Sequence, residues 1–546
     1  MLSQRPGAFP SSYRTYGGSA LTALALTLSL LSVWQDLGSP GNGRAAIAAI
    51  VIWLWLTMLV ISIAHVWQGV SKSFFGAFSV ITGLSATLSG FWLLVFYPAV
   101  MSMDAIWQWR QALRHTYSLW HPPAMAMLMH VTQCCSQSPS LFSFIQGLLF
   151  WGFMFCLIRQ VAGGDRRFLV LCGVMMVVPP LWLYSNAAVS NTWTAAFMML
   201  SAAFLIGSIR TKASRLLIGA VLALSVAIMF RRETAIIVPV LIAAYLWRFG
   251  RHRGVSRAGC DILLIVAVVW LPAALVAASP HVMKIDDYRP AQQGLLNYYV
   301  GIVAHSRPSM TDTKIERERQ SVDRTFGPGT FQGLLDRYVC YSSSFIGWRR
   351  DELPPAAQRW AMMKNSFGTA QLARIAVRHP LGLIEHQMCY VAYLTQFAAL
   401  DYQDWGTIDK NRNLNQLREK MDIPVESRLP WIKDQYSRLM KALLRHPALS
   451  LIVRHYVFLI AAAVALVVGL RTRRVELIIP SLFSLVYPVA FVIAGPSTPW
   501  RYLLPSYVLS WISILPLASD FVGRGAVDGS SSGKSRTRNE EPRTKN

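Results

Sequence analysis

The sequence has 546 residues, of which 53% are hydrophobic and 14% are charged. A soluble domain has nearer a quarter of its residues charged, so this composition argues against a water-soluble enzyme. Lysine and arginine number 52 against 27 acids, which gives a formal net charge of +25. Most of this excess lies in short loops and tails between apolar runs, as the positive-inside rule predicts, so we expect no nucleic-acid partner.

Apolar runs of about 17–25 residues recur along the chain, which is the length a helix needs to cross the hydrocarbon layer. Because the backbone must satisfy its own hydrogen bonds in lipid, these runs predict an all-α polytopic membrane protein with about 12 transmembrane helices. The predicted spans lie near residues 18–35, 45–67, 76–97, 140–160, 168–185, 192–209, 214–230, 234–248, 261–279, 452–470, 475–494 and 501–520.

With these spans, all the strongly basic short loops and both tails fall on one side, which places both termini in the cytoplasm. The chain then divides into a cytoplasmic N-terminus with two extra transmembrane helices (1–75), a seven-helix core (76–279) with an interfacial outer loop (98–139), a mostly helical extracytoplasmic domain (280–451), three C-terminal transmembrane helices (452–520) and a disordered basic cytoplasmic tail (521–546). The pattern Asn-x-Ser/Thr does not occur, which favours a bacterial inner membrane over a eukaryotic endomembrane.

Two features of the large outer segment allow more than one interpretation. Residues 381–400 are apolar enough for a further span, but one more crossing would separate the basic groups, so we predict a helix packed on the membrane face or inside the domain. Cys340 and Cys389 lie in the same segment. They could form a disulfide outside the cytoplasm, or they could be two unrelated free thiols.

Asp104 is a lone carboxylate in the stretch FYPAVMSMDAIWQWRQALRHTYSLWHPPA, residues 96–124, just after a predicted span. The residues that follow predict an interfacial helix with Trp107 at headgroup depth and arginines such as Arg110 reaching lipid phosphates. His121-Pro122-Pro123 then ends the helix. A carboxylate here can take a proton from an acceptor hydroxyl while a lipid phosphate leaves. The alternative is that Ser102 and Asp104 only cap the helix, and that His121 is a turn residue.

Three more clusters are predicted on the same side of the membrane. Arg231 and Arg232, with Glu233, join two spans against the positive-inside bias, which is a functional-site hypothesis by default. Arg501-Tyr502 opens the last span, and Ser190-Asn191 belongs to a short polar turn. The alternatives are that the arginines reach outer headgroups, with Arg232 paired to Glu233, and that the turn caps helices.

The order of these features resembles the GT-C superfamily of integral membrane glycosyltransferases, which use polyprenyl-phosphate-linked sugars. The resemblance rests on an acid in the first outer loop (YPAVMSMDAIWQW), a His-Pro element, six further spans and an outer domain. The pieces FRRETAIIVP, RHPLGLIEH and PWRYLLP also resemble motifs of bacterial members, and the resemblance covers roughly residues 76–520, so that 76–279 would be the shared GT-C-like core.

The resemblance implies that Asp104 is the catalytic or acceptor-orienting acid, and that Arg231, Arg232 or Arg501 grips the donor phosphate. We add His121 and Glu233 as catalytic candidates, Arg110 as a phosphate ligand, and Trp107, Tyr502 and Asn191 as substrate-lining residues. One departure concerns the second acid of many members. The matching place reads Ser190-Asn191, so either Glu233 or an acid of the outer domain substitutes, or the activity is altered or lost.

The expected function is transfer of a sugar from a polyprenyl-phosphate donor to a lipid or cell-envelope glycan acceptor at the outer face of the membrane. The alternatives are a transporter or flippase of lipid-linked oligosaccharide, which should show mid-span charges and internal symmetry, and a glycan ligase of similar architecture. No HxxxH pattern or pair of acids at metal spacing occurs, so no protein metal cage and no cofactor is firmly implied. A divalent cation such as Mg²⁺ or Mn²⁺, bridged by Asp104 and a phosphate, stays open.

Overall fold

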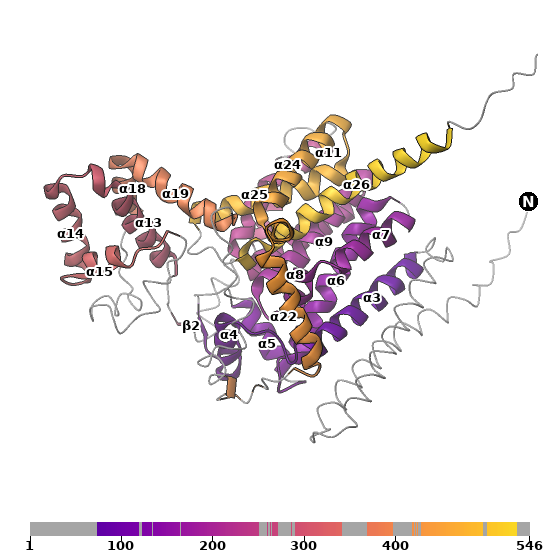
Figure 1. The fold of residues 1–546 in the computed structure, drawn as a ribbon, viewed down its shortest axis with the longest axis horizontal. Helices are drawn as coiled ribbons and strands as arrows, with labels where there is room; N and C mark the ends of the chain where they lie inside the picture. Colours follow the sequence, from indigo (N-terminus) through magenta and orange to yellow (C-terminus); the bar gives the residue numbers. More distant parts are fainter. Residues whose placement is uncertain are drawn as a thin grey trace, which may run out of the picture.

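Long apolar helices form a bundle, and a smaller group of helices extends from one end of it (Figure 1). The computed structural model describes residues 74–118, 123–133, 135–163, 165–249, 290–340, 369–396, 427–494 and 500–531, with 259, 262–263, 265–270, 285–286, 418–419, 421 and 423 between them. The predicted spans at 18–35 and 45–67, and much of the span at 261–279, lie outside these residues. The described residues are almost entirely helical, which confirms the predicted all-α class.

The bundle combines helices from both halves of the chain. Its members are α3 (Phe74–Val95), α6 (Ser140–Ala162), α7 (Asp165–Met176), α8 (Pro179–Asn186), α9 (Ser190–Thr211), α10 (Ser214–Phe230), α11 (Val238–Phe249), α24 (His455–Thr472), α25 (Val475–Ala494) and α26 (Leu504–Ser531). Helix α9 packs between α6 and α10, and α26 packs against α9, α24 and α25. The N-terminal and C-terminal helices therefore share one core.

Several of these helices have the length and composition of membrane spans. Four described helices qualify: Ser140–Ala162, Ser190–Thr211, His455–Thr472 and Val475–Ile493. A fifth candidate is the pair Arg167–Met176 and Pro179–Asn186, and Val80–Val95 and Ser214–Phe230 are shorter apolar helices. The protein is therefore a helical membrane protein, while the count of about 12 spans stays a prediction.

The predicted span at 168–185 is not one straight helix. It is divided into α7 and α8, which bend by 75° relative to each other. The break falls at Pro179-Pro180, the first two residues of α8. Proline has no backbone N–H to donate and disfavours a helical residue before it, so the helix cannot continue through this point.

Small residues allow the bundle helices to approach closely. A side chain at Gly147 of α6 would meet Ser89 of α3, and Ser89 instead donates a hydrogen bond to the Phe144 carbonyl at 2.8 Å. On the other side of the bundle, the hydroxyls of Ser484 and Ser510 join α25 to α26 at 2.5 Å. Such contacts are typical of helix packing in lipid, where apolar burial alone gives helices little reason to associate.

Short elements connect the helices of the bundle. They are α4 (Met103–Arg114), β1 (Tyr117–Ser118), α5 (Ala124–Gln133), β2 (Ile285–Asp286), α22 (Pro430–Arg445), α23 (Pro447–Ser450) and the 3₁₀ turns η2 (Arg232–Ile237), η7 (Leu451–Val453) and η8 (Trp500–Leu503). Of these, α4, α5 and β2 lie below α9 in Figure 1, and the two short strands pair in parallel. Helix α22 contacts α3, and its Tyr436 donates a hydrogen bond to the Pro179 carbonyl at 3.4 Å.

A separate helical group lies on the left of Figure 1, within the segment predicted to be extracytoplasmic, and we call it the outer domain after that prediction. Its elements are α13 (Pro290–Ser306), η5 (Arg307–Ser309), α14 (Asp312–Phe326), α15 (Thr330–Asp336), α18 (Thr369–Arg378) and α19 (Pro380–Leu394). Helices α13 and α19 approach closely because Gly301 leaves room for His386, and Gly382 leaves room for Ser306. Tyr298 of α13 donates a hydrogen bond to the Val492 carbonyl of α25 at 2.8 Å, which ties the domain to the bundle.

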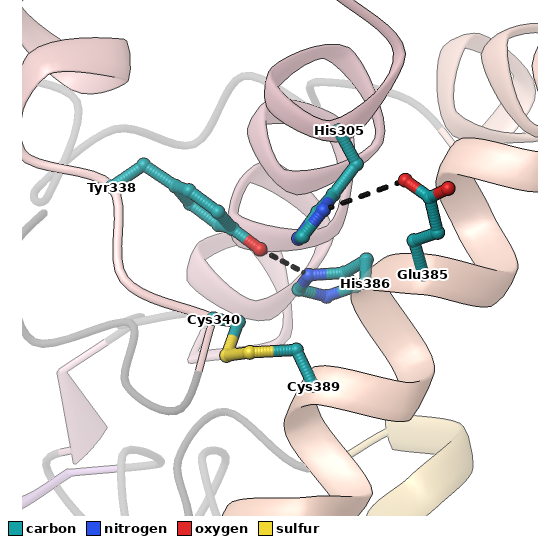
Figure 2. The surroundings of a disulfide bond; sticks show 6 residues. All are labelled: His305, Tyr338, Cys340, Glu385, His386 and Cys389. Carbon is teal, nitrogen blue, oxygen red and sulfur yellow. Dashed lines mark hydrogen bonds and ion pairs between the residues drawn. A yellow bond between two sulfur atoms is a disulfide. The ribbon is translucent and has the colours of Figure 1, made fainter.

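Cys340 and Cys389 form a disulfide, so of the two interpretations of these cysteines the paired one holds. Figure 2 shows that the bond joins the segment after α15 to α19, beside His386. In the same segment, Tyr338 makes a 2.6 Å hydrogen bond to Nδ1 of His386. Nδ1 of His305 in α13 lies 3.7 Å from the carboxylate of Glu385 in α19. The crosslink thus holds the end of the α14–α15 region against the helix that approaches the bundle.

We predict that Cys340→Ser weakens the outer domain. The free energy of unfolding of this domain should fall by about 2–4 kcal/mol, because the disulfide restricts the unfolded chain. Hydrogen exchange of α13 and α19 in lipid nanodiscs measures this loss. Cys135→Ser is the control, because Cys135 is a free, exposed thiol. Unchanged exchange in Cys340→Ser would contradict a stabilising role for the bond.

A second prediction concerns acid. Burial, together with the charge of His305, lowers the pKa of His386 to about 4 from its ordinary value of 6.5. The unfolded chain therefore binds one more proton than the folded domain between these values, so stability is fully present above pH 6.5 and is lost as pH falls toward 4, by about 1.4 kcal/mol per pH unit. His386→Gln should flatten the decline in thermal stability between pH 6.5 and 4, whereas His446→Gln, at an exposed position, should not. An equal decline in His386→Gln would contradict this assignment.

Candidate functional site

Asp104 lies in the first turn of α4, and the chain before it is pinned to the neighbouring turn. Ser102 caps the helix by accepting a hydrogen bond from the Ala105 N–H at 3.3 Å. Val100 exchanges backbone hydrogen bonds with the 186–188 turn, through Asn186 and Ala188, at 3.2 and 2.9 Å. Ser102 therefore supplies the side-chain cap, and the Asp104 carboxylate lies near the positive end of the helix dipole.

Arg501 lies in η8, whose position is fixed by Trp500. The Trp500 ring is 1% exposed, stacks on Tyr184 with centroids 4.9 Å apart, and donates a hydrogen bond to the Val453 carbonyl at 2.7 Å. His455 at the start of α24 donates to the Trp500 carbonyl at 3.0 Å. Because these contacts hold both the ring and the backbone of Trp500, the next residue, Arg501, has a defined position.

Asp104 and Arg501 form an ion pair across 397 residues of sequence. Nη2 of Arg501 donates to Oδ2 of Asp104 at 2.5 Å. The side chains are 29% and 15% exposed, so the pair is at the edge of the protein interior. An ion pair of this length and burial is a charge-assisted hydrogen bond, stronger than a neutral one.

Arg231 brings a second cation to the same place. It ends α10, and its guanidinium lies 4.2 Å from the ring centroid of Tyr502 and 5.4 Å from that of Phe491. Nε is 4.0 Å from the Glu233 carboxylate, while Nη1 is buried without a hydrogen-bond partner. Burial lowers the pKa of Arg231, but Glu233 and the nearby tyrosines raise it more, so the pKa lies above its ordinary value. This guanidinium is therefore charged, buried and incompletely hydrogen-bonded.

These residues enclose a narrow pocket, which we call the Asp104 pocket. Its cavity volume is about 10 Å³, and it is lined by Ser102, Asp104, Ala105, Gln108, Ala188, Val189, Ser190, Asn191, Arg231, Arg501 and Tyr502. Asn191 is 2% exposed, and its Oδ1 has no hydrogen-bond partner. A buried polar atom without a partner costs free energy, so two such atoms, on Arg231 and Asn191, are available to hydrogen-bond a polar ligand.

The structure brings together five of the residues predicted for the site: Asp104, Arg231, Arg501, Tyr502 and Asn191. Glu233 is next to Arg231 but does not line the pocket.

The other predicted residues lie elsewhere. Arg232 is exposed, although it directly follows the buried Arg231. Trp107 is 47% exposed, and Arg110 lies over its ring at 5.1 Å, so both are on the outer face of α4 rather than in the pocket. His121 lies outside the described residues.

Gln108 and Phe491 were not anticipated. Gln108 is 3% exposed and lines the pocket one helical turn after Asp104. The i,i+4 spacing could have revealed it, because side chains at this spacing share a helix face. Phe491 contacts Arg231 from α25, and nothing in the sequence near it points to that contact. The 185–192 turn caps α8 but not α9: Thr192 donates to the Tyr184 carbonyl in the last turn of α8 at 2.8 Å, whereas α9 has no side-chain cap.

The arrangement suits an anion beside a hydroxyl group more than a metal cage. In the described part of the chain, no three His, Cys, Asp or Glu side chains cluster as metal ligands. Two guanidinium groups supply planar donors that match phosphate oxygens, and the carboxylate can accept a proton. Comparisons of the chain with family models, with curated proteins and with solved structures give no match. The chemistry of the Asp104 pocket is therefore the ground for a functional proposal.

Proposed function

We propose that the protein transfers a sugar from a polyprenyl-phosphate donor to a lipid or glycan acceptor, as a membrane glycosyltransferase of the GT-C type. The observation that supports it most is the convergence of Asp104, Arg231 and Arg501 on one pocket at an end of the bundle. The two cations are the groups that a leaving phosphate requires, and the acid is the group that an attacking hydroxyl requires.

In the proposed reaction, the acceptor hydroxyl oxygen attacks the anomeric carbon of the donor sugar. The new bond from oxygen to carbon forms while the bond from that carbon to the phosphate oxygen breaks. The Asp104 carboxylate takes the hydroxyl proton, and the lipid phosphate leaves with the electron pair. Arg231 and Arg501 stabilise the charge that develops on that phosphate, and buried amides such as Asn191 are available to sugar hydroxyls.

The pocket is at the opposite end of the bundle from the basic loops. Helix α9 begins at Ser190 in the pocket and ends at Arg210 and Thr211, while α25 begins beside Arg474 and reaches Arg231 through Phe491. At the basic end, Arg210 and Glu476 form a 3.1 Å ion pair. Since basic loops favour the cytoplasm, we assign the pocket to the outer face of a bacterial inner membrane, with both termini inside. A disulfide in the adjoining domain is consistent with an oxidising compartment on that side.

We predict that Asp104→Asn abolishes sugar transfer in a protein that still folds, because an amide cannot take up the proton. Lipid and glycan mass spectrometry of a deletion strain, complemented with wild type or variant, identifies the product and measures its loss. Size-exclusion behaviour and thermal stability of the purified variant provide the folding control. Normal product levels with Asp104→Asn would remove this acid from the mechanism.

The two adjacent arginines give a matched pair for the donor site. Arg231→Ala should weaken binding of undecaprenyl phosphate by about 1.5–3 kcal/mol, the scale of a hydrogen bond to a charged group. Arg232→Ala should have little effect, because Arg232 is exposed and does not line the pocket. Binding is measured with labelled lipid and protein in nanodiscs. Equal effects of both variants would indicate attraction by net charge rather than a phosphate contact.

A further inference from the structure

In the structure Arg501 binds Asp104, whereas the proposed reaction needs Arg501 at the donor phosphate. Its Nη2 is directed at Oδ2 of Asp104, at 2.5 Å. The proposed donor phosphate needs the guanidinium, and the proposed acceptor hydroxyl needs the carboxylate oxygen. While the ion pair is formed, Nη2 of Arg501 and Oδ2 of Asp104 bind each other and not a substrate.

The size of the pocket agrees with a closed state. Its cavity volume of about 10 Å³ lies far below the roughly 300–1,000 Å³ of pockets that enclose small molecules. The ion pair forms part of the lining, between α4 and η8. Room for a sugar phosphate therefore requires that the pair open.

The two arginines are not equally able to move. Arg231 is 7% exposed, stacks on Tyr502 and Phe491, and has one unpartnered donor, Nη1. The guanidinium of Arg501 is farther from the Tyr502 ring, at 5.9 Å, and its side chain is 15% exposed. Arg231 is thus a fixed cation with a donor ready for an incoming anion, and Arg501 is a cation at the pocket edge that is held by Asp104.

We propose that Arg501 exchanges partners during the reaction: it binds Asp104 in the substrate-free protein, and it moves to the donor phosphate when Arg231 has bound that phosphate. This inference rests on the proposed function and adds to it an order of events. Release of Arg501 frees Oδ2 of Asp104, so the base becomes available only when the donor is in place. When the lipid phosphate departs, Arg501 returns to Asp104.

The exchange has a simple electrostatic basis. The donor phosphodiester carries one negative charge, as the carboxylate does, and its oxygens fit the guanidinium fork. The phosphate gains a second negative charge as its bond to the sugar breaks, so its attraction for Arg501 is strongest at that stage. The cost of removing Arg501 from Asp104 is offset when the acceptor hydroxyl donates a hydrogen bond to the carboxylate. A base that is masked until the donor binds also cannot direct a stray water molecule at an incompletely bound sugar.

Binding of undecaprenyl phosphate tests the exchange without any transfer assay. Protein is placed in phosphatidylcholine nanodiscs, and the Kd of the labelled lipid is measured for wild type, Asp104→Asn, Arg501→Gln and the double variant. If Asp104 competes for Arg501, Asp104→Asn should tighten binding about tenfold, the effect of releasing one charge-assisted hydrogen bond. In the Arg501→Gln background, the same Asp104→Asn substitution should change Kd by less than about twofold.

Two results would overturn the exchange. Unchanged or weaker binding by Asp104→Asn would show that the pair does not compete with the phosphate. Equal tightening with and without Arg501 would show that loss of a negative charge, and not release of Arg501, is the cause. These results differ from a failure of the proposed function, in which wild-type protein would not bind undecaprenyl phosphate at all.

Discussion

The contact between Asp104 and Arg501 is the constraint on which the arrangement of the site depends. It joins α4 to η8, the turn before α26 and 397 residues later, and it does so at the edge of an apolar bundle. A charged residue in such a place is costly unless it is paired. The contacts of Trp500 with Tyr184 and Val453 hold one side of the pair, and the backbone pairing of Val100 with the 186–188 turn holds the other. The pocket therefore exists because helices from both ends of the chain pack together.

The bundle has two chemically different ends. One end has the arginines of short loops, including Arg210, which is neutralised in part by Glu476. At the other end, Arg231 is buried between Tyr502 and Phe491. Exposed cations on a loop serve orientation in the membrane, whereas a buried cation with an unpartnered donor is suited to a ligand. Burial therefore distinguishes Arg231 from the many exposed arginines that make the chain basic.

The apolar runs predicted most helices of the bundle, because apolar length determines them. The side of the membrane on which Asp104, Arg231 and Arg501 lie stays a prediction from loop charge. The sequence could not show which of Arg231 and Arg232 lines the pocket, because the two residues are adjacent and the backbone at the end of α10 decides it. Pairing of Cys340 with Cys389 stayed open, because it depends on how α15 and α19 meet. The pair Pro179-Pro180 indicates a helix break, but hydropathy averaged over a window does not detect a bend. Gln108 shares a face with Asp104 and could have been found from spacing alone.

Helix α19 turns a row of apolar side chains outward. Leu381, Ile384 and Met388 are 72%, 52% and 67% exposed, and they stand at helical spacing beside an open groove that continues to Tyr456 of α24. The opposite face of the same helix is packed into the bundle core through Tyr390 and Leu394. A fragment cut at the bundle boundary would present both faces to water. Helix α19 thus ties the domain to the bundle with one face, and the exposed apolar row on its other face suits contact with hydrocarbon.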